Sequence, residues 1–310
     1  MRIIRVPLRV SLFGGGTDLP DYLETHDATI ISFAISRYMY VVWNERPTGG
    51  CRLSYSKVEE LGTLRYAEHT LVRAVALKYG LPEPGTLTII SDIPKGTGLG
   101  SSSALTVGLC KLAGACEKSG RDLAATAFQL ENSVSPEVGC QDHLPAAFGG
   151  MKVYKINKEI SYKPVSKSIQ AIIDEFGLLL YTGQARDSSK QLKKWKDEET
   201  LNGIRLLAEE QARSLDIWTP KFLGSVLNET WQLKRSIPGV VDKELDRQYT
   251  LAMKIGAYGG KLCGAGGGGV WFFIVSPGDR DRVKGALGLQ EIPFKVEEEG
   301  VKEWNLDASL

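Results

Sequence analysis

The sequence predicts an α+β protein with two lobes. Short apolar or alternating segments fill the first ninety residues, with one helix-patterned segment among them, and this arrangement is typical of a strand-rich region. The second half carries long charged segments with helical periodicity and one short apolar run over 269–275. A chain of 310 residues is long enough for two domains. The change in composition predicts domains over 1–160 and 161–310.

Several elements are expected in the first half. Strand-like segments lie over 3–13, 28–35, 38–44 and 86–90, and a helical pattern lies over 70–80. A further helix is expected to begin near Ser102, where the residues are small or apolar on every side. Such a helix is typically buried against a sheet. Gly120 is expected to end it.

Two long helical segments are expected in the second half. Residues 187–218 are charged but place apolar residues at helical spacing, which indicates a helix with a solvated face. Residues 238–262 repeat the helical signal, and Gly259 and Gly260 are expected to end that helix. The apolar run over 269–275 predicts a buried strand.

The composition limits the partners of the chain. The net charge is +1, so no global field gathers nucleic acid or an anionic membrane, and any bound anion must be held locally. Five scattered cysteines form no CxxC pair, which predicts reduced thiols and a cytoplasmic protein. The first residues lack the long apolar segment of a secretory leader, so we expect no export, and no run of eighteen apolar residues occurs in the sequence. We therefore expect neither a nucleic-acid partner nor a membrane partner.

Glycines cluster at three places, and the second cluster raises a functional question. The clusters are FGGGTD at 13–18, PKGTGLGSSS at 94–103 and CGAGGGG at 263–269. Glycine lets backbone amides approach a ligand closely, and a helix that starts directly afterwards presents free N–H groups. A phosphate chain fits that geometry. By itself, the second cluster is equally consistent with a turn capped by a serine.

Two better-known glycine motifs do not match the second cluster. Walker A requires a lysine after its glycines, whereas the nearby Lys95 precedes them. The dinucleotide fingerprint fails at Ser101, where a third glycine is required. The acidic residue about twenty positions further on, Asp122, stands beside a helix start, with no strand end before it.

Three segments resemble, in order, the three motifs of the GHMP kinases, named after galactokinase, homoserine kinase, mevalonate kinase and phosphomevalonate kinase. They are LRVSLFGGGTD, PKGTGLGSSSA and KLCGAGGGG, and they extend from about residue 5 to about residue 275. The resemblance implies a ribosomal-protein-like N-terminal lobe, a ferredoxin-like C-terminal lobe, and ATP and Mg²⁺ as cofactors. The residues expected to contact ATP are Pro94, Lys95, Gly96, Thr97, Gly98, Leu99, Gly100, Ser101, Ser102 and Ser103.

The resemblance also assigns the groups that phosphoryl transfer requires. Asp142 would accept or orient the proton of the acceptor hydroxyl, although an isolated aspartate in QDHLP would more often cap a turn. Glu131 would bind Mg²⁺ together with the hydroxyl of Ser102 or Ser103. Arg9 would neutralise charge near the transferring phosphoryl or keep Asp142 ionised.

The third glycine cluster is expected to close over the site from the second lobe. Four consecutive glycines, Gly266 to Gly269, exceed what one tight turn needs, because each costs conformational entropy on folding. Gly266 and Gly267 are therefore expected to lie near the phosphate or the substrate.

The first motif is the best guide to the acceptor. FGGGTDLPDY resembles the family's kinases of heptose 7-phosphate and of fucose, whereas galactokinases carry acidic and histidine residues at the positions of Gly15 and Gly16. The resemblance implies that Asp18 binds sugar hydroxyls, because a carboxylate accepts hydrogen bonds from two adjacent hydroxyls. Gly15, Gly16 and Thr17 are expected beside it.

A phosphate on the sugar would need a cation. Arg186 lies in YTGQARDSS, which resembles the family's TGxxRxS segment, and a guanidinium suits a dianionic phosphate. A helix beginning at Asp187 or Ser188 is an equal alternative. The chain departs from the relatives of the heptose kinase at Cys140, which replaces a lysine, and at His143, which replaces a glutamine. We expect Cys140 to be inert and His143 to tune or pack against its neighbours.

Together these observations predict an ATP-dependent kinase. It would phosphorylate the anomeric hydroxyl of a sugar or sugar phosphate, with D-glycero-D-manno-heptose 7-phosphate as the first candidate, for nucleotide-sugar and glycan synthesis such as that of lipopolysaccharide. Fucose, mevalonate or phosphomevalonate are alternative acceptors, and a ligand sensor without turnover is a different class. The chain is expected to be a monomer or a homodimer.

Overall fold

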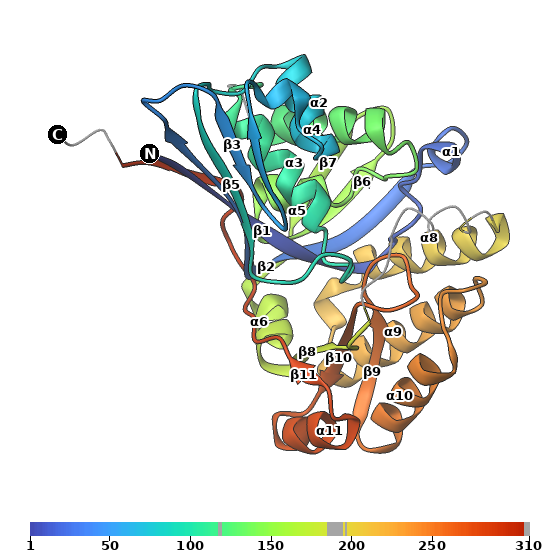
Figure 1. Ribbon diagram of the computed structural model, residues 1–310. Helices are drawn as coiled ribbons and strands as arrows, with labels where there is room; N and C mark the ends of the chain where they lie inside the picture. Colours follow the sequence, from blue (N-terminus) through green and yellow to red (C-terminus); the bar gives the residue numbers. More distant parts are fainter. Residues whose placement is uncertain (117–119, 185–194, 196, 307–310) are drawn as a thin grey trace.

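The structure is a computed structural model that describes residues 1–116, 120–184, 195 and 197–306. Within these residues two sheets form, and each carries its own helices (Figure 1). Strands and helices are mixed along the chain without regular βαβ alternation. The predicted α+β class is confirmed.

The first sheet is built around one long strand, β2 (Ala28–Glu45). Sequence analysis predicted two strands in this region, but they are continuous. One side of β2 pairs throughout with β1 (Arg2–Phe13), and the other pairs first with β6 and then with β5. The remaining strands are β3 (Cys51–Ser54), β4 (Val58–Leu61), β5 (Gly85–Ser91), β6 (Met151–Ile156), β7 (Ile160–Pro164) and β12 (Lys302–Asn305).

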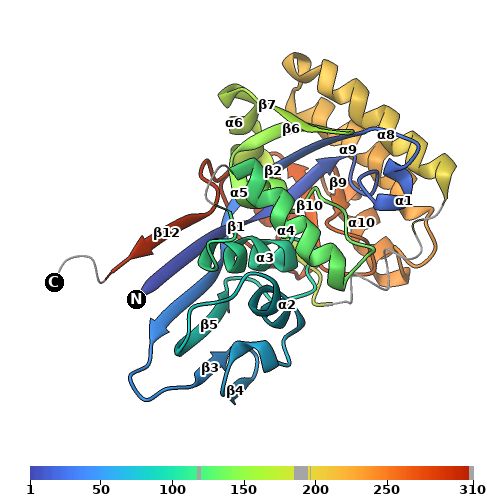
Figure 2. The ribbon, with the colours of Figure 1, turned by 90° about the horizontal axis from the view of Figure 1, so that it is seen from above.

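Four helices gather on one face of this sheet (Figure 2). They are α2 (Thr70–Lys78), α3 (Ser101–Leu112), α4 (Gly120–Val134) and α5 (His143–Phe148). Helix α3 is buried on nearly all sides, as predicted, and packs on β1 and β2. Gly108 permits this approach, because a Cβ atom there would lie 2.8 Å from Val41 and 3.1 Å from Val6.

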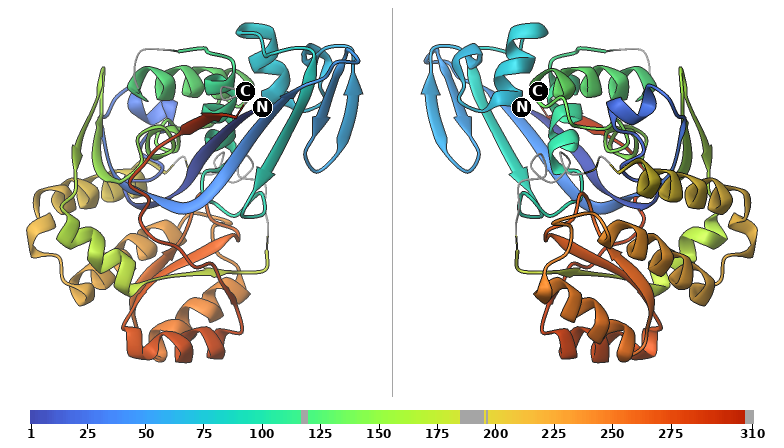
Figure 3. Two further views of the ribbon diagram at one scale, coloured as in Figure 1. Left: turned by 90° about the vertical axis from the view of Figure 1, so that its left-hand side faces the viewer. Right: turned by 90° about the vertical axis from the view of Figure 1, so that its right-hand side faces the viewer.

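The second sheet has the strand order β11-β8-β10-β9. Its central strand β10 (Val270–Val275) is buried at every residue, as predicted for the apolar run. The other strands are β8 (Gly177–Tyr181), β9 (Ala257–Leu262) and β11 (Gln290–Glu291). The helices of the second half are α6 (Lys167–Phe176), α8 (Glu198–Arg213), α9 (Pro220–Arg235), α10 (Lys243–Lys254) and α11 (Arg280–Leu287), shown from two sides in Figure 3.

Two predicted helix ends were wrong. Helix α3 ends at Leu112, before a left-handed Gly114 (φ +64°), and Gly120 begins α4. Helix α10 ends at Lys254, and Gly259 and Gly260 belong to strand β9. At Gly259 a Cβ atom would lie 1.8 Å from a backbone oxygen of helix α9, so the glycine serves helix–strand packing.

The chain crosses between the two sheets more than once. Strand β7 lies at the predicted boundary near residue 160, and β12, from the end of the chain, pairs with β1 in the first sheet. The division into domains 1–160 and 161–310 stays a prediction.

Candidate active site

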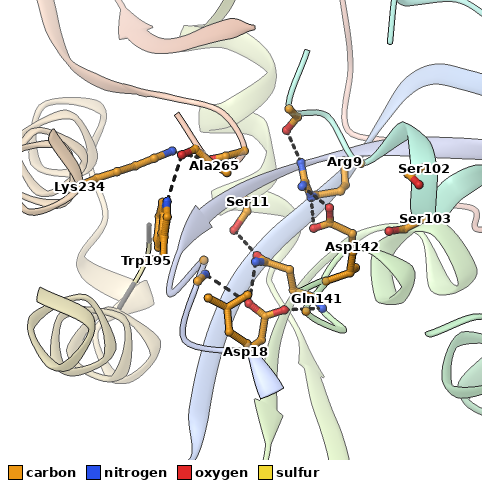
Figure 4. A pocket seen from close by; sticks show the side chains of 18 of the residues that line it. Arg9, Ser11, Asp18, Ser102, Ser103, Gln141, Asp142, Trp195, Lys234 and Ala265 are labelled. Atoms are coloured by element: carbon orange, nitrogen blue, oxygen red, sulfur yellow. Dashed lines mark hydrogen bonds and ion pairs between the residues drawn. The ribbon is translucent and has the colours of Figure 1, made fainter. Parts of the chain in front are cut away.

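A pocket lies between the two sheets, where all three glycine clusters meet (Figure 4). Its walls come from the end of β1, the start of α3, the last turn of α4, the loop before α5, helices α8 and α9, and the end of β9. The predicted residues that line it are Arg9, Gly15, Gly16, Asp18, Gly96, Gly98, Gly100, Ser101, Ser102, Ser103, Glu131 and Asp142. Tertiary structure therefore brings together most of the candidate residues from three distant parts of the chain.

The second glycine cluster ends at the N-terminus of helix α3. Gly96, Gly98 and Gly100 all have left-handed φ angles, between +76° and +79°, which glycine adopts without strain. Gly100 occupies the N-cap position without a side-chain cap. The alternative of a turn capped by a serine is therefore wrong. The uncapped amides and the positive end of the helix dipole suit a phosphate.

The second and third glycine clusters are in backbone contact. A Cβ atom on Gly98 would lie 2.4 Å from the Cys263 oxygen, and one on Gly269 would lie 2.4 Å from the Thr97 oxygen. These approaches are open only to glycine, whose φ angles here are +79° and +108°. The glycines thus allow the loop before α3 to pack directly against the loop after β9.

Gly264 and Ala265 line the pocket, whereas Gly266 and Gly267 are not among its lining residues. The Gly267 amide donates to the Val240 oxygen over 2.6 Å, and a Cβ atom on Gly266 would lie 2.5 Å from Val240. Both glycines are thus engaged with the loop before α10. A substrate contact by Gly266 and Gly267 stays a prediction.

Several other predicted residues support loops. Thr17 is fully buried, and its hydroxyl donates to the Gly14 oxygen over 2.8 Å. Leu99 is buried in the core, and its carbonyl accepts from the Arg9 amide over 3.0 Å. Pro94, Lys95 and Thr97 belong to the same loop but are not among the pocket-lining residues. Arg186 lies outside the described residues.

Arg9 and Asp142 form a two-point ion pair at the pocket. Arg9 Nε donates to Oδ1 over 2.7 Å and Nη2 donates to Oδ2 over 2.5 Å. Burial tends to lower the pKa of Arg9, but Asp142 outweighs it and raises the pKa above its usual value. Asp142 stands at the N-cap position of α5, yet its side chain makes no cap hydrogen bond. The capped-turn interpretation of Asp142 is therefore wrong.

Glu131 is almost completely buried on helix α4 and faces the start of α3. Burial tends to raise the pKa of Glu131, but contacts with His143, Ser102 and Ser103 outweigh it and lower the pKa. A serine hydroxyl beside an ionised carboxylate supplies the hard oxygen ligands that Mg²⁺ prefers. Ser102 is exposed and Ser103 is buried, and both line the pocket. Glu131 and one of the two serines would hold a magnesium ion, which would supply positive charge beside a bound phosphate.

Asp18 is fully buried at the opposite side of the pocket. Its carboxylate accepts from the Gly16 amide over 3.3 Å, from the Gln141 amide over 2.9 Å and from Gln141 Nε2 over 2.8 Å. Burial raises the pKa of Asp18 to about 6. Ser11 completes the chain of contacts by donating to Gln141 Oε1 over 2.8 Å. Most of the hydrogen-bonding capacity of Asp18 is therefore used within the protein.

Sequence analysis missed several residues of the site. Ser11 and Gln141 flank the predicted residues and could have been noticed in the first motif and in QDH. Lys261 opens the third motif, lines the pocket, and donates to the Leu12 oxygen over 2.8 Å. Burial lowers the pKa of Lys261 to about 8.

Trp195 and Lys234 form a wall of the pocket that the sequence did not indicate. Trp195 lines the pocket, lies against Gly16, and donates from Nε1 to the Ala265 oxygen over 3.1 Å. Lys234 Nζ donates to the Leu262 oxygen over 2.5 Å and lies 5.7 Å from the Trp195 ring centroid. Figure 4 shows both side chains across the pocket from Asp142.

Family comparisons agree with this geometry. The family GHMP kinases N terminal domain matches residues 65–150, and the family GHMP kinases C terminal matches residues 221–290. The chain belongs to the GHMP kinase family. As a GHMP kinase it is an ATP-dependent phosphotransferase that acts on a hydroxyl group, and the predicted fold of the family is confirmed.

Individual relatives cover this GHMP kinase almost end to end. D-glycero-alpha-D-manno-heptose 7-phosphate kinase of Campylobacter jejuni is 29% identical over 99% of this chain and 100% of its own. Mevalonate kinase of Pyrococcus horikoshii is 28% identical over 90% of this chain and 84% of its own. The crystal structure of a D-glycero-D-manno-heptose 1-phosphate kinase from Bacteroides thetaiotaomicron is 22% identical and superposes with a TM-score of 0.80, covering 99% of both chains.

Two further features bear on the predictions about membrane partners and about Cys140. Within the described residues, no helix is both long and apolar enough to cross a bilayer. Burial raises the pKa of Cys140 well above its usual value. A thiol that stays protonated is a poor nucleophile, in agreement with an inert Cys140.

Proposed function

We propose that this GHMP kinase transfers the γ-phosphoryl group of ATP to the anomeric hydroxyl of a sugar or sugar phosphate. D-glycero-D-manno-heptose 7-phosphate is the first candidate. The observation that carries the proposal is the Arg9–Asp142 ion pair, which adjoins the uncapped N-terminus of α3 on one side of the pocket. The proposed proton acceptor, Asp142, and the proposed phosphate-binding amides of α3 thus border the same part of the pocket.

The donor side uses backbone amides and oxygen ligands. The amides of Gly100 to Ser103 would hold the phosphate chain of ATP. Ser102 or Ser103, together with Glu131, would hold Mg²⁺, which neutralises phosphate charge when it is bound. Arg9 would add positive charge beside the transferring group.

The acceptor side uses the carboxylate of Asp142. The acceptor oxygen forms a bond to the γ-phosphorus while the bond from that phosphorus to the bridging oxygen of ADP breaks. The proton of the acceptor hydroxyl passes to Asp142, and ADP leaves with the bond's electron pair. Arg9 keeps Asp142 aligned by its two hydrogen bonds.

The choice of acceptor rests on the first motif and on the heptose-kinase relative. Asp18 would accept from a sugar hydroxyl through its remaining lone-pair positions, and Gly15 and Gly16 leave room beside it. Arg186 would contact a phosphate of the acceptor. Mevalonate is the second candidate, because a mevalonate kinase of similar identity covers most of the chain.

An acceptor panel tests the proposal. Purified enzyme is assayed for ADP release with ATP, Mg²⁺ and either heptose 7-phosphate, fucose, mannose or mevalonate, and the product is examined by phosphorus NMR. We expect the highest kcat/KM with heptose 7-phosphate and a new phosphate on C1. A preference for mevalonate, or a phosphate on another carbon, would overturn the assignment of the acceptor. ATP binding without turnover of any acceptor would favour a ligand sensor.

A further inference from the structure

His143 is fully buried beside the candidate metal ligand Glu131. Its Nε2 atom lies 2.7 Å from Glu131 Oε2 in an ion-pair contact. The Nδ1 atom is buried without a hydrogen-bond partner among the described residues. The Phe128 ring packs edge-on against the imidazole, with 5.7 Å between the ring centroids. His143 therefore has one apolar side and one polar contact, which is made to a carboxylate.

The contact joins the helix that carries Glu131 to the helix that Asp142 directly precedes. Glu131 belongs to α4, and His143 is the first residue of α5. Asp142 directly precedes His143 and pairs with Arg9. The imidazole of His143, the residue after Asp142, thus links the backbone at Asp142 to the carboxylate of Glu131.

The remaining contacts of Glu131 come from helix α3. Thr106 Oγ1 lies 3.4 Å from Oε2. The hydroxyl groups of Ser102 and Ser103 help to lower the pKa of Glu131. His143 and Thr106 engage the same oxygen, Oε2, from opposite helices. These contacts restrain the Glu131 carboxylate. They leave Oε1 available on the side of the serines that line the pocket.

We propose that His143 is a positioning residue, which holds the Glu131 carboxylate in the orientation that binds the magnesium ion of the ATP complex. The inference rests on the proposed function, in which Glu131 is a metal ligand. Groups that hydrogen-bond a ligating carboxylate fix its orientation, and their loss typically costs about 10- to 100-fold in metal affinity or activity. A histidine that only filled space would tolerate an apolar side chain of similar size.

Two variants separate positioning from packing. His143→Leu keeps most of the volume and removes the polar contact, whereas His143→Gln keeps an N–H donor close to the place of Nε2. Calorimetry measures ATP affinity with saturating Mg²⁺ and again with EDTA. The readout is the gain in ATP affinity that Mg²⁺ supplies, and thermal unfolding checks that each variant is folded.

We expect His143→Leu to reduce the magnesium-dependent gain by about 10- to 100-fold while ATP affinity in EDTA stays at the wild-type value. His143→Gln should recover most of the gain. Should His143→Leu not fold, His143→Asn replaces it, because its shorter amide falls short of Glu131. The inference would be overturned if the Leu or Asn variant kept the full magnesium-dependent gain in ATP affinity. It would also be overturned if the Gln variant showed no larger gain than the Leu or Asn variant. If the wild type itself shows no gain, the proposed metal role of Glu131 fails instead.

Discussion

Arg9 and Asp142, 133 positions apart in the sequence, are joined by two parallel hydrogen bonds of 2.7 and 2.5 Å. Arg9 Nη1 also donates to the Gly98 oxygen over 2.6 Å. One guanidinium therefore ties the proposed proton acceptor to the glycine loop before α3. A planar guanidinium with five N–H groups can make both connections at once.

Replacing Asp142 with asparagine should abolish most of the turnover. The amide cannot accept the acceptor's proton, so we expect kcat to fall by about 10²- to 10⁴-fold while ATP affinity changes little. The unfolding free energy should fall by about 1–3 kcal/mol, because Arg9 stays buried without its counter-charge. Steady-state kinetics, calorimetry and urea unfolding measure the three quantities.

The matched control is Asp281→Asn, because that carboxylate is 92% exposed on helix α11. It should change kcat and stability by less than the experimental error. A wild-type kcat in Asp142→Asn would exclude Asp142 as the proton acceptor.

Replacing Gly98 with alanine should separate the two glycine loops. The new Cβ atom would meet the Cys263 oxygen at 2.4 Å, in addition to the strain of φ +79°. Gly49→Ala is the control, because its φ is +72° and no atom lies within 4 Å of the added carbon. We expect the control to lose about 1–2 kcal/mol of stability from backbone strain alone.

Gly98→Ala should lose more stability than the control, and its heat of ATP binding should disappear. The reason is that the neighbouring atoms are backbone and can move aside only if the loop shifts. Equal losses in the two variants would show that the contact between the loops is not tight in solution.

The buried carboxyl of Asp18 predicts a defined pH dependence of stability. Its pKa in the folded protein is about 6, above the usual 3.8, so the folded state holds the proton more tightly than the unfolded state. The stability that Asp18 contributes is complete below about pH 4 and is lost as the pH rises through 6. A shift of about two pKa units corresponds to about 3 kcal/mol.

Comparison with Asp18→Asn isolates this contribution, because asparagine does not titrate. Urea unfolding of both proteins between about pH 4 and pH 7 should show the wild type losing about 3 kcal/mol relative to the variant. A difference that stays constant, or that grows in favour of the wild type, would show that the folded state does not raise the pKa of Asp18.

Gln141 should affect the binding of the acceptor and leave the affinity for ATP unchanged. Gln141→Ala removes the bridge between Ser11 and Asp18, which the Gln141 side chain makes over 2.8 Å on each side. We expect the acceptor KM to rise about 10-fold, corresponding to the loss of one or two ordinary hydrogen bonds, with unchanged ATP affinity. Gln232→Ala, on the exposed face of α9, is the control. A loss of ATP affinity would place Gln141 on the donor side.

Local sequence was sufficient for most of the fold. Apolar patterns identified β1, α2, β5 and β10, because burial of one face leaves a periodic pattern and burial of both faces leaves a continuous apolar run. The prediction of secondary structure failed where a long-range contact determined which element forms. Gly259 and Gly260 of β9 resembled a helix end, but Gly259 is required by the close approach of helix α9 and Gly260 by that of strand β10.

The sequence by itself determined the family, the three glycine clusters and the chemical types of Arg9, Glu131 and Asp142. Only the tertiary structure decided the partners: Asp142 with Arg9, and Asp18 with Gln141. It also brought Trp195 and Lys261 to the pocket. The physical reason is that a motif specifies local backbone geometry, whereas the partner of a buried polar side chain depends on which distant elements pack beside it.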